Sequence, residues 1–276
     1  MKTSKLRIDY HFHPNLPKNN QRALKKCRYW WEKLKENNIQ CLIITEHSYK
    51  NPRRAFELMD KARPKGFFCF PGMEYITKEG IDIIVFSDTP KIYGLDELKP
   101  FRLKYNDLVD FVLSKKNLFA FVTHPYILGT TSVIRNLNRK DYTKAVNLLG
   151  AVEISNSVYD NLEIIMKKIP FNIIFKQKLE NIKKTRDLPK SDYPKDIKFL
   201  AAGSDATYTQ ELGNCFEIDL PKKEVPSNIF QYVAKNKGKG RVSVKEKKLN
   251  LLLLLQTAST VFNEFLIKVI LRIKGV

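Results

Sequence analysis

The chain has 276 residues, of which 43% are hydrophobic and 28% are charged. This composition is typical of globular proteins and excludes a disordered or collagen-like chain. The 49 Lys and Arg residues outnumber the 29 Asp and Glu residues, which gives a net charge of +20. A surface this basic favours polyanionic partners such as nucleic acid, phosphorylated metabolites or acidic lipid, although a solvated lysine-rich surface is the alternative.

The cysteines and the N-terminal residues bear on the cellular compartment. Cys27, Cys41, Cys69 and Cys215 form no Cys-x-x-Cys pair, so a zinc ribbon is not indicated. Free thiols fit a reducing compartment. Charged residues and histidines follow Met1 too soon for a secretory signal. We therefore expect a cytoplasmic protein.

Short apolar runs alternate with longer amphipathic runs along most of the chain. The seven predicted strands cover residues 5–13, 39–47, 66–75, 81–88, 117–125, 151–157 and 197–206. The predicted helices between them cover residues 20–37, 51–64, 104–116, 137–148 and 160–182. This alternation predicts a parallel sheet with crossover helices. So many strands in the first three quarters of the chain favour one barrel-like α/β domain over residues 1–245.

The C-terminal run "LNLLLLLQTASTVFNEFLIKVILRIKGV" predicts a helical extension over residues 246–276. Polar residues interrupt it too often for a transmembrane helix. Every fourth residue from Gln256 to Arg272 is polar, which predicts an amphipathic helix. The apolar turn Leu251–Leu255 favours a helix docked on the domain. The neighbouring lysines leave peripheral membrane contact as the alternative.

The chain has four histidines, and each lies at or near the end of a predicted strand: His11, His13, His47 and His124. His11 and His13 share one face of the first strand with Asp9, because alternate strand residues point the same way. In parallel α/β barrels the carboxyl ends of the strands meet at the rim that carries the active site. The histidines are therefore expected to converge.

Three acidic residues accompany the histidines at predicted strands: Glu74, Glu153 and Asp205. Imidazole and carboxylate groups without thiolates are ligands that suit zinc, manganese or iron. The sequence therefore predicts a metal site at this rim.

These residues occur in the ordered set "HFHP", "ITEHS", "PGMEY", "VTHP", "VEISNS" and "GSDAT". The set resembles the polymerase and histidinol phosphatase (PHP) family of metal-dependent phosphoesterases, and it covers residues 7–207. The resemblance implies a distorted seven-stranded (β/α) barrel of the PHP type, to which the C-terminal helix is an extension. It also implies a site of two or three metal ions.

The resemblance implies a role for each matching residue. His11, His13 and Asp205 would hold a first metal ion. Glu74 would bridge this ion to a second one. His124 would bind the second ion.

The resemblance also implies roles for two residues at the edges of the site. Glu153 would add a ligand to the second ion or act as a nearby acid, and His47 would belong to a third ion. The chain departs from the family pattern here: Glu46 replaces the usual aspartate, and Thr207 replaces a closing histidine. Asn19 stands where some members place another histidine. We therefore expect two divalent ions, manganese or zinc with iron as an alternative, and a weak third site.

The expected activity is hydrolysis of a phosphate ester, either a monoester or a diester, by a metal-activated water. The catalytic residues would be His47, Glu74 and Asp205. His47 would protonate the leaving oxygen, while the metal ions would stabilise the charge on the phosphoryl oxygens.

The expected substrate is a phosphorylated small molecule or nucleotide. Its phosphate would be held by some of four basic residues, for which an exposed helix start is the alternative role: Lys50, Arg53, Arg54 and Arg135. Two other functions stay open. The net charge favours a nuclease or nucleic-acid-processing subunit, and Thr207 suggests a non-catalytic scaffold.

Overall fold

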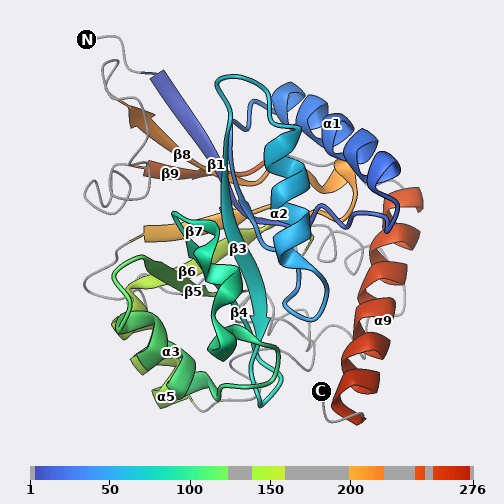
Figure 1. Cartoon of the computed structure of the whole chain (residues 1–276). Helices are drawn as coiled ribbons and strands as arrows, with labels where there is room; N and C mark the ends of the chain where they lie inside the picture. The colour runs from blue at the N-terminus through green and yellow to red at the C-terminus, as the bar shows by residue number, and fades with distance from the viewer. Residues whose placement is uncertain (1–3, 124–138, 159–198, 221–239, 246–250, 274–276) are drawn as a thin grey trace, which may run out of the picture.

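A nine-stranded sheet curls almost into a closed barrel at the centre of the molecule, as Figure 1 shows for a computed structural model. The structure describes residues 4–123, 139–158, 199–220, 240–245 and 251–273. The strands follow one another across the sheet in the order β7-β6-β5-β4-β3-β2-β1-β8-β9. Their bounds are β1 Ser4–Phe12, β2 Cys41–Ile44, β3 Phe68–Ile76, β4 Asp82–Ser87, β5 Leu118–Val122, β6 Ala151–Asn156, β7 Phe199–Gly203, β8 Cys215–Leu220 and β9 Gly240–Ser243.

All seven predicted strands are present as β1 to β7, but the described sheet has nine strands and is mixed rather than parallel. β4 runs antiparallel to both of its neighbours, and β8 runs antiparallel to β1 and β9. The five residues 77–81 that link β3 to β4 allow only a tight turn, because a parallel crossover needs a dozen residues or more. β5 consequently runs in the same direction as β3, so β1, β2, β3, β5, β6 and β7 share one orientation.

β1 is the strand at which the barrel closes. Its first half pairs with β8, from Ser4 opposite Leu220 to Ile8 opposite Phe216. Its second half meets the segment that follows β7, where the Asp205 backbone N–H donates to the His11 carbonyl over 2.7 Å. The end of β1 is thereby brought beside the end of β7.

Five α-helices are described: α1 Asn20–Glu36, α2 Pro52–Lys61, α3 Tyr105–Leu113, α5 Arg139–Leu149 and α9 Leu251–Ile273. Short 3-10 helices cover Pro90–Gly94, Asp96–Leu98 and Thr209–Glu211. The first four α-helices match predicted ones. The helix predicted over residues 160–182 lies outside the described residues.

Apolar packing fills both the interior of the barrel and the space under the helices. Inside, Tyr10 on β1 contacts Phe86, Phe121 and Phe216 edge to face, with ring centroids 6.2–6.3 Å apart. Outside, α1 buries Trp30 and Trp31 against β1 and β2, in a cluster that includes Phe12. The barrel interior is therefore a packed core, and a site can form only at its rim.

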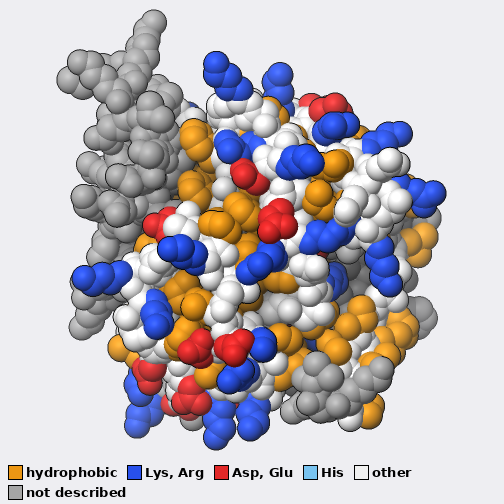
Figure 2. All heavy atoms as spheres, viewed as in Figure 1, with side chains coloured by type: hydrophobic (Ala, Val, Ile, Leu, Met, Phe, Trp, Pro, Cys, Tyr) orange, Lys and Arg blue, Asp and Glu red, His pale blue; other side chains and the backbone are white. Residues whose placement is uncertain are grey.

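The C-terminal helix α9 lies along one side of the molecule (Figure 1). Its Lys268 Nζ lies 2.6 Å from Oδ2 of Asp82 at the start of β4. Within the described part of the chain, no helix has the length and apolar character needed to cross a membrane. On the face shown in Figure 2, Lys and Arg side chains are spread widely rather than gathered into one patch.

Candidate metal centre

Six of the predicted site residues lie close together at the carboxyl ends of the similarly oriented strands. His11 lies in β1, and His13 follows it. Glu74 lies in β3 and Glu153 lies in β6. His47 follows β2, and Asp205 follows β7. All are buried except Asp205, whose side chain is 17% exposed. Charged groups are rarely buried unless they are paired or bind a cation.

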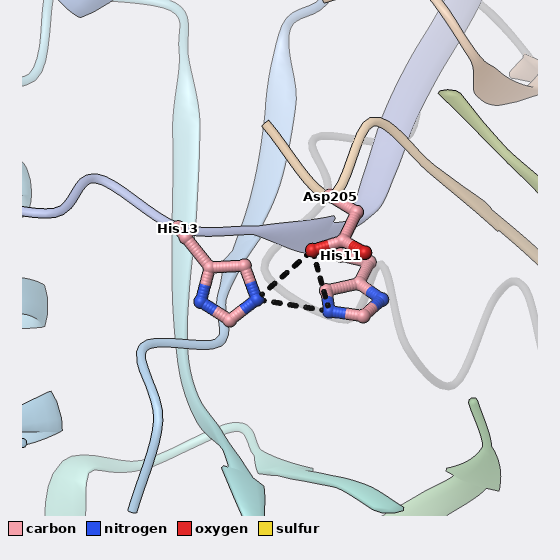
Figure 3. Close-up of side chains that lie close together, drawn as sticks. All are labelled: His11, His13 and Asp205. Carbon is pink, nitrogen blue, oxygen red and sulfur yellow. Dashed lines mark hydrogen bonds and ion pairs between the residues drawn. The ribbon is translucent and has the colours of Figure 1, made fainter. Parts of the chain in front are cut away.

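A first group consists of His11, His13 and Asp205 (Figure 3). The two Nε2 atoms lie 3.0 Å apart, and they lie 3.4 and 3.3 Å from Oδ1 of Asp205. Three atoms with lone pairs thus point at one another, which is the arrangement in which a cation replaces protons.

A second group consists of His13, His47 and Glu74. His47 Nδ1 lies 2.6 Å from Oε2 of Glu74, and His13 Nε2 lies 3.5 Å from the same oxygen. The other oxygen, Oε1, lies 3.8 Å from His11 Nε2. The two oxygens of Glu74 therefore face different groups, and His13 belongs to both.

Glu153 and Asn156 support the first group from β6. Glu153 Oε1 lies 3.0 Å from His11 Nδ1, the nitrogen that points away from His13. Such a contact fixes the orientation of a metal-binding imidazole. The Asn156 amide donates to both oxygens of Glu153 over 3.4 Å and to Oδ2 of Asp205 over 3.1 Å.

The sequence reasoning missed Asn156 because strict alternation places residues 153 and 156 on opposite faces of a strand. The pairing of β6 with β7 shifts register between Glu153 and Ser155, a β-bulge that brings Asn156 to the same side as Glu153. The sequence "EISN" itself carries no signal for that bulge.

Asp9 holds the end of β7 in place but belongs to neither ligand group. Its carboxylate accepts from the Ser204 N–H over 3.0 Å and from the Ser204 hydroxyl over 2.5 Å. It also accepts from the backbone N–H of His11 over 3.1 Å. Asp205 follows with φ +50, a left-handed conformation that aspartate tolerates better than most residues. This strained residue is fixed by its neighbours, as is common at functional sites.

Gly203 permits the close approach of β7 to β1. A Cβ atom at this position would lie 2.4 Å from the His11 Cβ and 2.7 Å from the His11 nitrogen. Any larger residue would push the two strands apart. Gly203 therefore shapes the site by its lack of a side chain, although it offers no ligand atom.

Glu46 forms the outer edge of the site beside the second group. It accepts from the Asn15 N–H over 3.0 Å, and its Oε1 lies 3.8 Å from His13 Nδ1 and 3.3 Å from Lys50 Nζ. Burial opposes ionisation, but His13 and Lys50 outweigh it and hold the pKa of Glu46 well below its usual range. Glu46 therefore bears a negative charge at neutral pH.

The electrostatic balance of the centre favours a cation. Burial lowers the pKa of His11, but the carboxylates of Asp205, Glu153 and Glu74 outweigh it and raise that pKa to about 9. Burial and His47 likewise oppose protonation of His13, yet Asp205, Glu46 and Glu74 raise its pKa to about 9. The donor set and this excess of negative charge fit a divalent metal ion. These buried clusters could hold such an ion.

The predicted phosphate contacts have different surroundings. Lys50 lies at the edge of the centre, where its Nζ forms an ion pair with Glu46. Arg54 is committed to the preceding loop, because its Nη2 donates to the carbonyls of Pro17 and Lys18. Arg53 is exposed.

His124 and Arg135 lie outside the described residues, and their predicted roles stay predictions. Thr207 is buried, and its backbone N–H donates to Glu211 Oε2 over 2.8 Å.

Comparison with known proteins gives a likeness of fold. No protein-family model matches the chain, and no curated protein matches it. Among solved structures, the crystal structure of PsfC from Pseudomonas syringae PB-5123 is similar, with a TM-score of 0.57 over 95% of this chain and 99% of PsfC. The two sequences are 15% identical, so the likeness concerns the arrangement of the backbone alone.

Proposed function

We propose that the chain is a metal-dependent hydrolase that cleaves a phosphate ester of a small molecule or nucleotide. The observation that carries this proposal is the position of Glu74, whose two oxygens face two adjoining groups of potential ligands. A carboxylate placed in this way suits a bridge between two divalent ions. Manganese and zinc, with iron as an alternative, are the metals that accept imidazole and carboxylate together.

His11, His13 and Asp205 would hold one ion, and Glu74 would bridge it to the other, to which the resemblance adds His124. Bound divalent ions would supply an activated water and neutralise charge on a phosphoryl group. Glu153 and Asn156 keep His11 and Asp205 in position through the contacts described above.

His47 is the best-placed residue for proton transfer to the leaving oxygen. Its ring stacks on His13 at 4.5 Å and on Tyr49 at 4.8 Å between centroids. With Nδ1 held by Glu74, the ring cannot turn freely. A fixed imidazole beside the reacting group is a suitable general acid.

Lys50 and the overall charge favour a phosphorylated substrate. Lys50 Nζ is 3.3 Å from Glu46, and its side chain is 28% exposed. A cation at the edge of the centre would attract a substrate phosphate. The net charge of +20 adds a long-range attraction for anions. The resemblance of the motif set to PHP phosphoesterases supports the same reaction.

The test is a phosphoester screen with the full chain in manganese or zinc, with metal content measured in parallel. The substrates are p-nitrophenyl phosphate, bis-p-nitrophenyl phosphate, mono- and dinucleotides and short RNA. We expect turnover that chelators abolish and that His11→Ala removes. Turnover of RNA alone would favour the nuclease alternative. Metal-loaded protein that is inert towards every substrate would favour the scaffold.

The number of ions is expected to be two per chain. Three well-occupied ions would contradict the weak third site that Thr207 implies. In Thr207→His the added imidazole is expected to raise metal content towards three and to increase phosphomonoesterase activity. Unchanged content and activity would mean that a third ion has no part in this chain.

A further inference from the structure

The described side chains on the outward face of α9 are mostly apolar. Eight large apolar side chains on this helix are between 37% and 80% exposed: Leu252, Leu255, Phe262, Leu266, Ile267, Val269, Ile270 and Ile273. The docked-helix expectation places the turn Leu251–Leu255 in a core, yet Leu252 and Leu255 are 54% and 60% exposed. Figure 2 shows hydrophobic side chains at the surface in this region, with Lys and Arg side chains nearby.

The exposed side chains form one continuous band. At 3.6 residues per turn, their positions span about 160° of the helix circumference. Ser259 and Asn263 are the other exposed side chains described on α9. No exposed side chain described on this helix is charged.

On the opposite side of α9, Lys268 faces the protein. Lys268 lies nearly opposite the centre of the apolar band, and its side chain is only 15% exposed where it pairs with Asp82. A helix at a water-facing surface ordinarily turns its charged residues outward and its apolar side inward. An exposed apolar band of this kind marks a binding surface.

We propose that this face of α9 is a membrane-binding surface that lies in the plane of an anionic lipid bilayer. The apolar side chains would enter the boundary between headgroups and acyl chains, as in other interfacial helices. Lys268 would remain against the domain, so its ion pair with Asp82 would persist on the membrane. The helix would not need to cross the bilayer.

The shape of the band favours lipid over a second copy of the chain. A two-stranded coiled coil buries a narrow seam of alternating three- and four-residue steps and selects its partner with charges beside that seam. Ile267 and Ile270 lie outside the seam that runs from Leu252 to Ile273 and are nevertheless exposed. The small polar Ser259 interrupts the seam.

The charge of the molecule favours lipid for a second reason. Two chains that each carry a net charge of +20 repel one another. An anionic bilayer attracts the same chain, and this attraction weakens as salt shortens the range of the field. The apolar band and the net charge therefore point to one partner surface.

Vesicle flotation of the full-length protein tests the proposal. The vesicles contain either phosphatidylcholine alone or phosphatidylcholine with phosphatidylserine, at low and high salt. We expect strong binding to the anionic vesicles, weakened by salt, and little binding to the neutral ones. The double variant Phe262→Glu/Leu266→Glu, which places two charges in the band, is expected to lose at least about tenfold in partitioning.

Leu113→Glu is the matched control, because Leu113 on α3 is 43% exposed and lies far along the chain from α9. It should bind vesicles like the wild type. Circular dichroism establishes that each variant is folded, and Leu252→Glu/Leu255→Glu provides a second test of the band should the first variant fail to fold.

Two outcomes would overturn the proposal. Absence of binding to anionic vesicles by folded wild-type protein is the first. The second is a wild-type dimer in sedimentation that Phe262→Glu/Leu266→Glu converts to monomer without any effect on vesicle binding. That result would assign the band to a second copy of the chain.

Discussion

The metal centre and the outward face of α9 depart from the usual distribution of side chains in opposite directions. At the centre, His11, Glu74 and Glu153 are buried although they are ionisable. On α9, Phe262 and Ile273 are 60% and 80% exposed although they are apolar. Charges are seldom buried without partners, and extended apolar bands are seldom exposed in monomeric proteins. Under the two proposals, each region is completed by something outside the folded chain, a small cation in one and a broad apolar surface in the other.

The two regions also differ in how the fold holds them. The centre is fixed by short contacts between strands, such as the bonds from Ser204 to Asp9 and from Asp205 to His11. On α9 one described contact with the barrel is the ion pair of Lys268 with Asp82. Ligand geometry demands a rigid support, whereas a membrane-binding face tolerates small movements. Substitutions in one region should consequently leave the other unaffected, which the following predictions test.

The largest expected effect is that of Glu74→Gln on turnover. The amide keeps the shape of the side chain but loses the negative charge and one acceptor oxygen between the two ligand groups. Removing a residue that only supports a metal ligand typically lowers metal affinity or activity by about 10- to 100-fold. Glu74 lies between the ligand groups themselves, so we expect a loss of at least about 100-fold in metal-dependent turnover. Steady-state kinetics and metal analysis measure the change.

Vesicle binding by Glu74→Gln should equal that of the wild type. Glu36→Gln, at a side chain that is 57% exposed, is the control for loss of one carboxylate. Turnover that is unchanged in Glu74→Gln would remove Glu74 from the centre. Loss of vesicle binding would show that the two regions are coupled.

Gly203→Ala should weaken the support of the centre. Its new Cβ would meet the Cβ and backbone of His11 at 2.4 and 2.7 Å, so β7 would have to move away from β1. Overpacking of this kind costs about 1–3 kcal/mol in the free energy of unfolding. Urea unfolding measures that cost, and titration with manganese should show weaker binding.

Gly94→Ala is the matched control, because a Cβ at Gly94 has open space around it. This variant should unfold like the wild type. If Gly203→Ala is as stable as Gly94→Ala, β7 can move away from β1 at little cost in free energy. The centre would then be less rigid than proposed.

The sequence predicts where the strands and the site residues lie, but it does not predict the directions in which all of the strands run. The apolar runs identify β1 to β7 because buried strands must be apolar, whatever their direction. The reversed direction of β4 follows from the short link of residues 77–81, which the predicted strands already implied but the expectation of a parallel sheet overlooked. β8 contains the alternating run "CFEIDL", and its pairing with β1 is visible only in the fold.

The site shows the same limit in finer detail. The rare histidines and acids at strand ends pointed to a shared rim, and the structure brings six of them together. Asn156 was missed because a bulge in β6 changes which side chains share a face. On α9 the period of the sequence predicts an amphipathic helix. The ion pair of Lys268 with Asp82 shows that Lys268 faces the barrel, which the sequence does not predict.

Lys268→Met should loosen α9 while leaving the centre intact. The side chains of Lys268 and Asp82 are 15% and 2% exposed, so water screens their attraction only weakly. Loss of a hydrogen bond to a charged group costs about 1.5–3 kcal/mol. We expect faster proteolytic release of α9 and unchanged metal-dependent turnover. Reduced turnover with α9 still attached would mean that β4 transmits a change from Asp82 to the centre.

The smallest expected effect concerns Glu217, a buried carboxylate that is paired entirely by protein groups. Its Oε1 lies 3.0 Å from Lys5 Nζ and 2.7 Å from Arg241 Nη2, and its Oε2 lies 2.9 Å from Arg7 Nε. Burial raises its pKa, but the three basic groups outweigh burial and hold the pKa at about 2, against an ordinary value of 4.5. Glu217 is thus a buried charge balanced by protein groups, whereas we propose that metal ions balance the carboxylates of the centre.

A carboxylate with a depressed pKa stabilises the folded state above its unfolded pKa, and this contribution disappears as pH falls through the folded pKa. Glu217→Gln should therefore lower the free energy of unfolding by about 1 kcal/mol at pH 7, because the basic partners are mostly solvent-exposed. The gap from the wild type should shrink between pH 4.5 and 2. Chelators should leave it unchanged at every pH, while they should reduce the stability of the metal-loaded wild type. A gap that instead depends on chelators would place Glu217 in the same electrostatic system as the centre, and the distinction between carboxylates completed by protein and those completed by metal would fail.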